Sequence, residues 1–170
     1  MSTPTRTGTT DPAVPTTAAP TPTTATADIV RTARTTGALY LALALSGLVG
    51  FLLIRSQIVV ADDPAATLAN LATQESLARL GVVMELVVVI TQALVALSFF
   101  RLFRSVDVVA AGSVAAFGLV NAVTILVSAA LLATALDVSG DPTTALGAGA
   151  AGTAQLLYVV SGHLWTVGGI

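Results

Sequence analysis

The sequence contains no cysteine, no lysine and a single histidine, His163. Without cysteine the chain has no disulfide, no thiolate nucleophile and no cysteine-based metal site. With one imidazole, a zinc site would have to be built almost wholly from carboxylates, although zinc prefers several nitrogen or sulfur ligands. We therefore expect neither a metal nor another cofactor.

Basic charge and catalytic motifs are also scarce. Seven arginines stand against nine acidic residues, which gives a formal net charge of −2 and no basic stripe that could follow a phosphate backbone. The patterns G-x-S-x-G, H-E-x-x-H and G-x-x-x-x-G-K do not occur. The sequence therefore excludes nucleic acid as a partner, and we do not expect an enzyme.

What the chain has in abundance is apolar sequence. Hydrophobic residues make up 55% and charged residues only 9%, whereas soluble domains carry roughly a quarter charged residues. A bilayer core of about 30 Å needs about 20 apolar residues in a helix, the one open-chain structure that satisfies its own backbone there. Four stretches meet this need: 36–54, 80–100, 108–136 and 147–170. The predicted fold class is all-α, a multi-pass transmembrane helical bundle of about four transmembrane helices.

The amino-terminal region differs from the rest in composition. Residues 1–30 are rich in Thr, Pro and Ala and show no apolar periodicity, so we expect a disordered tail ahead of a transmembrane domain at 31–170. The first apolar run begins only at Gly37, after Asp11 and Asp28, and is too long for a secretory signal. We expect this run to be retained as a membrane anchor.

The distribution of arginine predicts the orientation. Basic residues near span ends favour the cytoplasmic side. Four arginines flank the start of the first span and the connection between the second and third: Arg31, Arg34, Arg101 and Arg104. The other two connections hold Arg55 and Arg79, together with five acidic residues. We expect a cytoplasmic amino terminus in the cell membrane of a bacterium, with Arg55, Arg101 and Arg104 as anchors at the membrane interface.

The connection between the first two spans carries a helix-start signal. Asp63 occupies an N-cap position and Pro64 the first helical position, followed by Leu68, Leu71 and Ala72 on one face. This pattern favours an interfacial helix over 64–74 on the outer side. An irregular loop with one helical turn is the alternative.

Four polar residues inside the apolar spans are candidates for a functional or structural role, and Glu85 is the most costly of them. A carboxylate in a span must be protonated, paired or turned to a wet cavity, at roughly 2.5–3.5 kcal/mol near the centre. Gln92 lies two turns further along the same face. His163 is either a satisfied packing residue or, if Glu85 faces it, a proton switch. Asn121 shares one side of its span with Gly118 and Ser128, which is typical of contacts between membrane helices.

Several segments together carry a family resemblance. They are the first span with its flanks at 33–60, the Asp-Pro connection with its R-L-G entry to the second span at 61–87, ALSFFRLFRSVDVVAA at 96–111 and HLWTVGGI at 163–170. These segments resemble the DUF4386 family of bacterial integral membrane proteins, whose function is uncharacterised. Similar members usually have about six spans, so the resemblance implies a chain truncated at its carboxyl terminus. It assigns no catalytic or binding residue.

Two functional hypotheses remain from the sequence. The first is a non-enzymatic structural or interaction component of the membrane, in which Glu85, Gln92, Asn121 and His163 make contacts between helices. Its expected partners are the lipid bilayer and either a second copy of the chain or other membrane proteins. The alternative is a small-molecule or proton-coupled transporter that uses Glu85 and His163 as a titrating pair.

Overall fold

The computed structural model describes residues 22–144 and 149–168 of the chain. The elements in chain order are α1 (Pro22–Gly47), the π-helix η1 (Leu48–Ile54), α2 (Arg55–Ile58), α3 (Pro64–Thr73), α4 (Glu75–Phe103), α5 (Val108–Gly140), the 3₁₀ helix η2 (Pro142–Thr144) and α6 (Gly149–Gly168). Within the described residues all regular structure is helical. The predicted all-α class is thereby confirmed.

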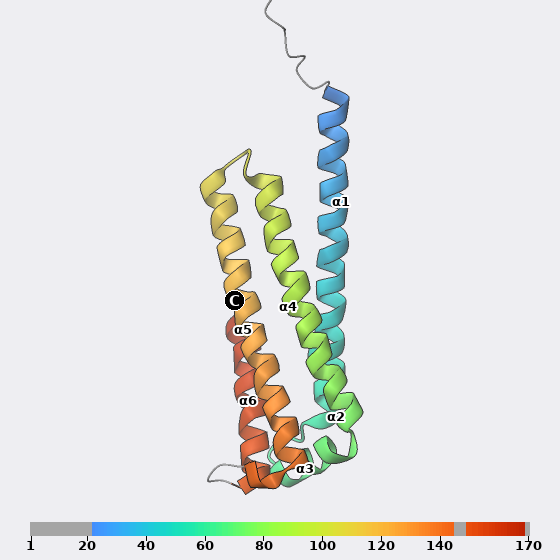
Figure 1. The fold of residues 1–170 in the computed structure, drawn as a ribbon, viewed down its shortest axis with the longest axis vertical. Helices are drawn as coiled ribbons and strands as arrows, with labels where there is room; N and C mark the ends of the chain where they lie inside the picture. The colour runs from blue at the N-terminus through green and yellow to red at the C-terminus, as the bar shows by residue number, and fades with distance from the viewer. Residues whose placement is uncertain (1–21, 145–148, 169–170) are drawn as a thin grey trace, which may run out of the picture.

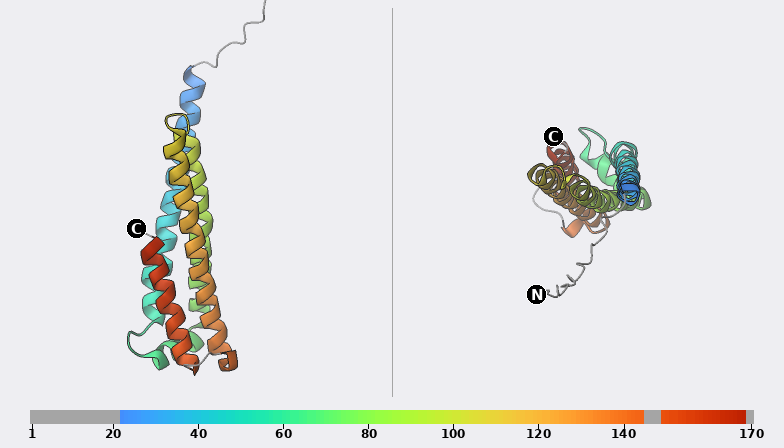
Figure 2. Two further views of the ribbon diagram at one scale, coloured as in Figure 1. Left: turned by 90° about the vertical axis from the view of Figure 1, so that its left-hand side faces the viewer. Right: turned by 90° about the horizontal axis from the view of Figure 1, so that it is seen from above.

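The helices form an elongated antiparallel bundle (Figure 1). The first rod, α1–η1–α2, runs beside α4, and α4 and α5 form a hairpin. The last helix, α6, packs along the lower part of α5 and ends about halfway up the bundle (Figures 1 and 2). The start of α1 and the α4–α5 turn therefore lie at the upper end, and α3 and η2 lie at the lower end.

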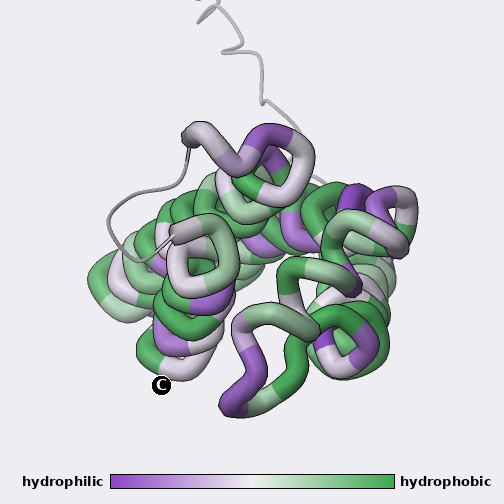
Figure 3. The backbone as a smooth tube through the Cα atoms, turned by 90° about the horizontal axis from the view of Figure 1, so that it is seen from below, coloured by the Kyte–Doolittle hydropathy of each residue, from purple (hydrophilic) through white to green (hydrophobic). Residues whose placement is uncertain are grey.

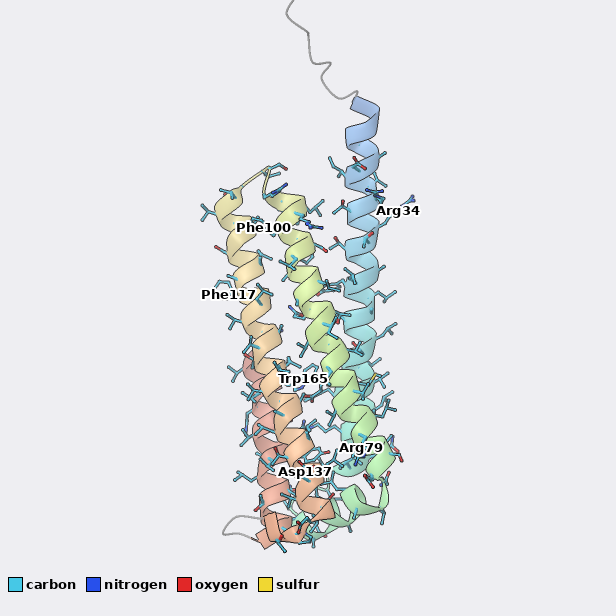
Figure 4. All side chains as sticks on the ribbon, in the orientation of Figure 1. Arg34, Arg79, Phe100, Phe117, Asp137 and Trp165 are labelled. Carbon is cyan, nitrogen blue, oxygen red and sulfur yellow. The ribbon has the colours of Figure 1, made fainter. Side chains whose placement is uncertain are left out.

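Within the part of the chain that the structure describes, three helical segments are long and apolar enough to cross a membrane: Thr26–Ile58, Glu75–Phe103 and Val108–Gly140. The fourth predicted stretch corresponds to α6, whose 20 residues span about 30 Å at 1.5 Å per residue. Many large apolar side chains are exposed on the outside of the bundle as well as buried in its interior. Figure 3 shows, from below, that apolar residues recur along the helices. Phe117, for example, points away from the bundle and is 77% exposed (Figure 4). Such an outer surface is expected where the surrounding solvent is lipid.

The helix α1 begins at Pro22, within the segment 1–30 that we expected to be a disordered tail. Proline suits the first helical turn, and an established helix extends at little cost into the alanine-rich segment next to it. Threonine hydroxyls bond back to the carbonyl four residues earlier, as Thr32 does to Asp28 and Thr36 to Thr32. The rest of the predicted tail, 1–21, lies outside the described residues.

The helix α3 begins where its sequence signal places it. The Asp63 carboxylate accepts a hydrogen bond of 2.9 Å from the Ala66 amide, and Pro64 takes the first helical position. Thr67 and Leu71 are fully buried, while Ala72 is exposed. The buried face of α3 therefore includes Thr67 instead of the predicted Ala72. This face packs chiefly against α6. The helix α3 therefore closes the lower end of the bundle.

Candidate functional site

A π-helical segment brings Arg55 into the bundle. A π-helix holds more residues per turn than an α-helix and shifts the face of the residues that follow, often at functional sites. Here η1 ends at the buried Ile54, and Arg55 opens α2 as a half-buried residue. Gly50 permits the close approach to α4, since a Cβ there would lie 3.0 Å from the Cβ of Met84. The π-helix thus rotates the start of α2 so that the Arg55 guanidinium points into the bundle.

Arg55 joins the first span to α6. Its Nη1 donates a hydrogen bond of 2.9 Å to the Ser161 hydroxyl, and its Nη2 donates to the Tyr158 carbonyl oxygen. The guanidinium also lies over the rings of Phe51 and Tyr158, 5.3 and 5.4 Å from their centroids. Gly162 leaves room for it, because a Cβ there would lie 2.9 Å from Nη2. The prediction of Arg55 as an interfacial anchor is therefore wrong.

Two buried serines continue this network toward α4. The Ser128 hydroxyl donates to the Ser161 hydroxyl at 3.0 Å, and both side chains are fully buried. Ser128 also faces the Glu85 carboxyl group, which is only 2% exposed. On its other side, Glu85 Oε1 accepts a hydrogen bond of 3.0 Å from the indole nitrogen of Trp165. We call this set the polar cluster: Arg55, Glu85, Ser128, Tyr158, Ser161 and Trp165.

The two charged members of the polar cluster do not touch. The ion pairs among the described residues join Arg31 to Asp28 and Arg79 to Glu75, all four on the surface. Arg55 and Glu85 lie near enough to interact through space, with the two serines between them. Glu85 Oε2 is buried and has no hydrogen-bond partner. Because Ser128 carries one hydroxyl proton, it can donate to Ser161 or to Glu85 but not to both.

Gln92 and Asn121 lie together in the middle of the bundle, away from the polar cluster. They line a common cavity of about 310 Å³, where α1, α4, α5 and α6 meet around the Trp165 ring. Both side chains are half-buried, and the structure gives neither amide a hydrogen-bond partner among the described residues. The buried Asn121 Oδ1 is one of the unpaired atoms.

His163 does not join either group. It is exposed on α6, so the Glu85–His163 pair on which the transporter alternative depended does not form. Tyr158, Ser161 and Trp165 share the inner face of α6 at spacings of three and four residues. His163 lies two residues, or about 200°, from Ser161 and from Trp165 and therefore points outward. Within the described residues there is also no group of three or more side chains suited to hold a metal ion.

The family of the chain follows from a match that covers most of its length. Residues 35–170 match the family described as "Domain of unknown function (DUF4386)". The chain belongs to the DUF4386 family. The comparisons with curated proteins and with solved structures returned no match. In this DUF4386 protein the matched region contains the whole polar cluster and both central amides.

Glu85 could be recognised from the sequence because a carboxylate is energetically costly in a membrane. Most of its neighbours in the polar cluster were not predicted. Tyr158, Ser161 and Trp165 follow helical spacing, so a helical projection of the last span would have placed them on one face. Arg55 gave no such signal. It directly follows an apolar run, where an interfacial role is the ordinary expectation, and no residue pattern announces the π-helix that turns it inward.

Proposed function

We propose that this DUF4386 protein is a non-enzymatic structural or interaction component of the bacterial cell membrane. The observation that supports this proposal is that the polar cluster links the end of the first rod, α4, α5 and α6 to one another. Arg55 joins α2 to α6, Ser128 joins α5 to α6, and Trp165 joins α6 to α4. Hydrogen bonds between membrane helices average about 0.6 kcal/mol and hold the helices in one arrangement.

The orientation that we propose has the amino terminus in the cytoplasm. Arg31, Arg34, Arg101 and Arg104 lie at the upper end, in the first part of α1 and at the end of α4. Arg34 is labelled in Figure 4. The lower end carries Arg79 with five acidic side chains: Asp62, Asp63, Glu75, Asp137 and Asp141. The excess of arginine at the upper end favours the cytoplasm for that end.

The structural role is tested by replacing Arg55 with methionine. The variant keeps an apolar stem of similar length but removes two charge-assisted hydrogen bonds, each worth about 1.5–3 kcal/mol. Thermal unfolding in detergent, followed by circular dichroism, should show a clear loss of stability. Arg101→Met is the matched control, because Arg101 is exposed and its replacement should change stability by less than about 0.5 kcal/mol. Equal stability of the two variants would contradict the structural role.

A second candidate function is a proton-coupled carrier that uses Glu85 without His163. It is favoured by the buried Glu85 Oε2, which has no partner, since an ionisable group inside a span often marks a transport pathway. In proteoliposomes, Glu85→Gln should abolish solute or proton flux driven by a pH gradient, while His163→Gln should leave it intact. Wild-type flux in Glu85→Gln would reject the carrier and leave the structural role unaffected.

A further inference from the structure

The cavity beside Gln92 and Asn121 has the composition of a ligand site rather than of a packing defect. Its volume of about 310 Å³ lies at the lower end of the range for small-molecule sites, which are mostly apolar with a few polar groups. Its walls are aliphatic and aromatic except for the two amides. A second cavity of about 620 Å³ shares Gln92 and Asn121 and reaches Phe117 and Gly168. The amides therefore face free space on both sides.

The two amides need partners that the described residues do not supply. A buried amide without a hydrogen bond costs about 1–3 kcal/mol in protein interiors. Gln92 and Asn121 lie in the middle parts of α4 and α5, away from the helix ends where we expect the aqueous boundary. The atom that is buried without a partner is Asn121 Oδ1, so the missing partner must donate a hydrogen bond, and the amide nitrogens of the two side chains can in turn donate to it.

Water alone fits the cavity poorly. At about 30 Å³ per molecule, the volume would hold about ten waters, and each buried water needs two to four polar partners. Because the walls offer only two side-chain amides, most of these waters would have to bond to one another against an apolar surface. An apolar body with one hydrogen-bonding group matches the walls and the amides together.

The cavity also opens outward, toward the membrane in our account. Ala44 and Leu48 line it, and both are exposed on the outer surface of the first span. No Cα atom of α1, η1 or α2 comes within 8 Å of one in α6 among the described residues, so side chains alone bridge this side. Trp165 forms the lower wall, with its ring 5.0 Å from that of Phe51.

We propose that this cavity binds a small amphipathic molecule from the membrane, with its hydrogen-bonding headgroup on Gln92 and Asn121 and its apolar body between α1 and α6. The headgroup is of the amide type, which both donates and accepts. Trp165 lies against the apolar body. The binding site shares Trp165 with the polar cluster, but Gln92 and Asn121, which would hold the headgroup, lie outside the cluster, so the proposal does not depend on the structural role proposed above.

Trp165 supplies the readout, because it is the single tryptophan of the chain. Bromine quenches indole fluorescence on contact, so reconstituted protein is titrated with 6-bromohexanamide and, in parallel, with 1-bromohexane. The wild type should show saturable quenching by the amide and only linear, partition-driven quenching by the bromoalkane. Linear quenching by both compounds would overturn the proposal.

Substitutions test separately whether binding requires the two amides and whether it requires the open cavity. Asn121→Leu and Gln92→Leu should each weaken saturable binding at least tenfold, whereas Thr134→Val, on an exposed position of α5, should match the wild type. Gly47→Leu provides an independent variant. A Cβ at Gly47 would lie 3.6 Å from the Trp165 ring, so leucine fills the cavity and leaves both amides in place. Saturable quenching that persists in folded Asn121→Leu and Gly47→Leu proteins would also overturn the proposal.

Discussion

Ser128 and Ser161 meet through a hydroxyl–hydroxyl contact of 3.0 Å at a point where both are fully buried. This contact joins α5 to α6 and forms the middle of the path from Arg55 to Glu85. The Ser161 oxygen accepts from Arg55 and from Ser128 together. Removal of this one oxygen therefore frees two donors.

The serine contact predicts unequal effects of two similar substitutions. Ser161→Ala should destabilise the protein by about 1–3 kcal/mol, because the charged Arg55 loses a partner as well as Ser128. Ser128→Ala should cost less, about 0.6–1.7 kcal/mol, since it removes one neutral donor. Thermal unfolding in detergent measures both. Ser113→Ala on the exposed face of α5 is the control, and a larger effect for Ser128→Ala than for Ser161→Ala would contradict the network.

Replacement of Gly162 by any larger residue should destabilise the protein, because the absence of a side chain there leaves room for Arg55. A Cβ there lies 2.9 Å from Nη2, so Gly162→Val should displace the guanidinium and lower the melting temperature by several degrees. Gly112→Ala in α5 is the comparison, because no atom lies within 4 Å of its added Cβ. Helix propensity favours alanine there by about 1 kcal/mol. Equal melting temperatures for the two variants would show that Gly162 has no such spacing role.

Glu85 should tolerate glutamine but not leucine. The glutamine oxygen can still accept from Trp165, and its amide can donate to Ser128, so Glu85→Gln should stay within about 1 kcal/mol of the wild type. Glu85→Leu leaves the indole N–H of the half-buried Trp165 without an acceptor and should cost about 1–3 kcal/mol. The measurement is unfolding in detergent together with the Trp165 emission spectrum. The interpretation of the site would be wrong if leucine proved as stable as glutamine.

Asp141, at the lower end outside the spans, predicts a local pH dependence. The Thr143 hydroxyl donates to its carboxylate at 2.6 Å and the Thr143 amide donates at 3.0 Å, which lowers the pKa of Asp141 below its usual range. A carboxylate with a lowered folded-state pKa stabilises the local structure above its unfolded pKa, and this contribution disappears as the pH falls through the folded value. Thr143→Val should raise the pKa of Asp141, as carboxyl ¹³C shifts would report. An unchanged titration would contradict the role of the hydroxyl.

Features that depend on neighbouring residues could be predicted from the sequence. Features that depend on how distant helices pack against one another could not. Asp63 and Pro64 begin α3 because capping is decided within four residues. Glu85 is conspicuous because its cost in a membrane depends on its own charge. By contrast, Arg55 turns inward only because η1 is a π-helix, and His163 turns outward because Trp165 holds the inner face of α6. Both outcomes depend on how whole helices are rotated against one another.

The most direct test of the account is the sidedness of its two ends. Because the native chain has no cysteine, single cysteines can be introduced at residues 35 and 106 at the upper end and at 61 and 143 at the lower end, all exposed positions. In intact cells, a membrane-impermeant maleimide should label 61 and 143 at once, and 35 and 106 only after the membrane is opened. Labelling of all four positions from the same side, or recovery of the chain in the soluble fraction without detergent, would contradict a bundle that crosses the membrane.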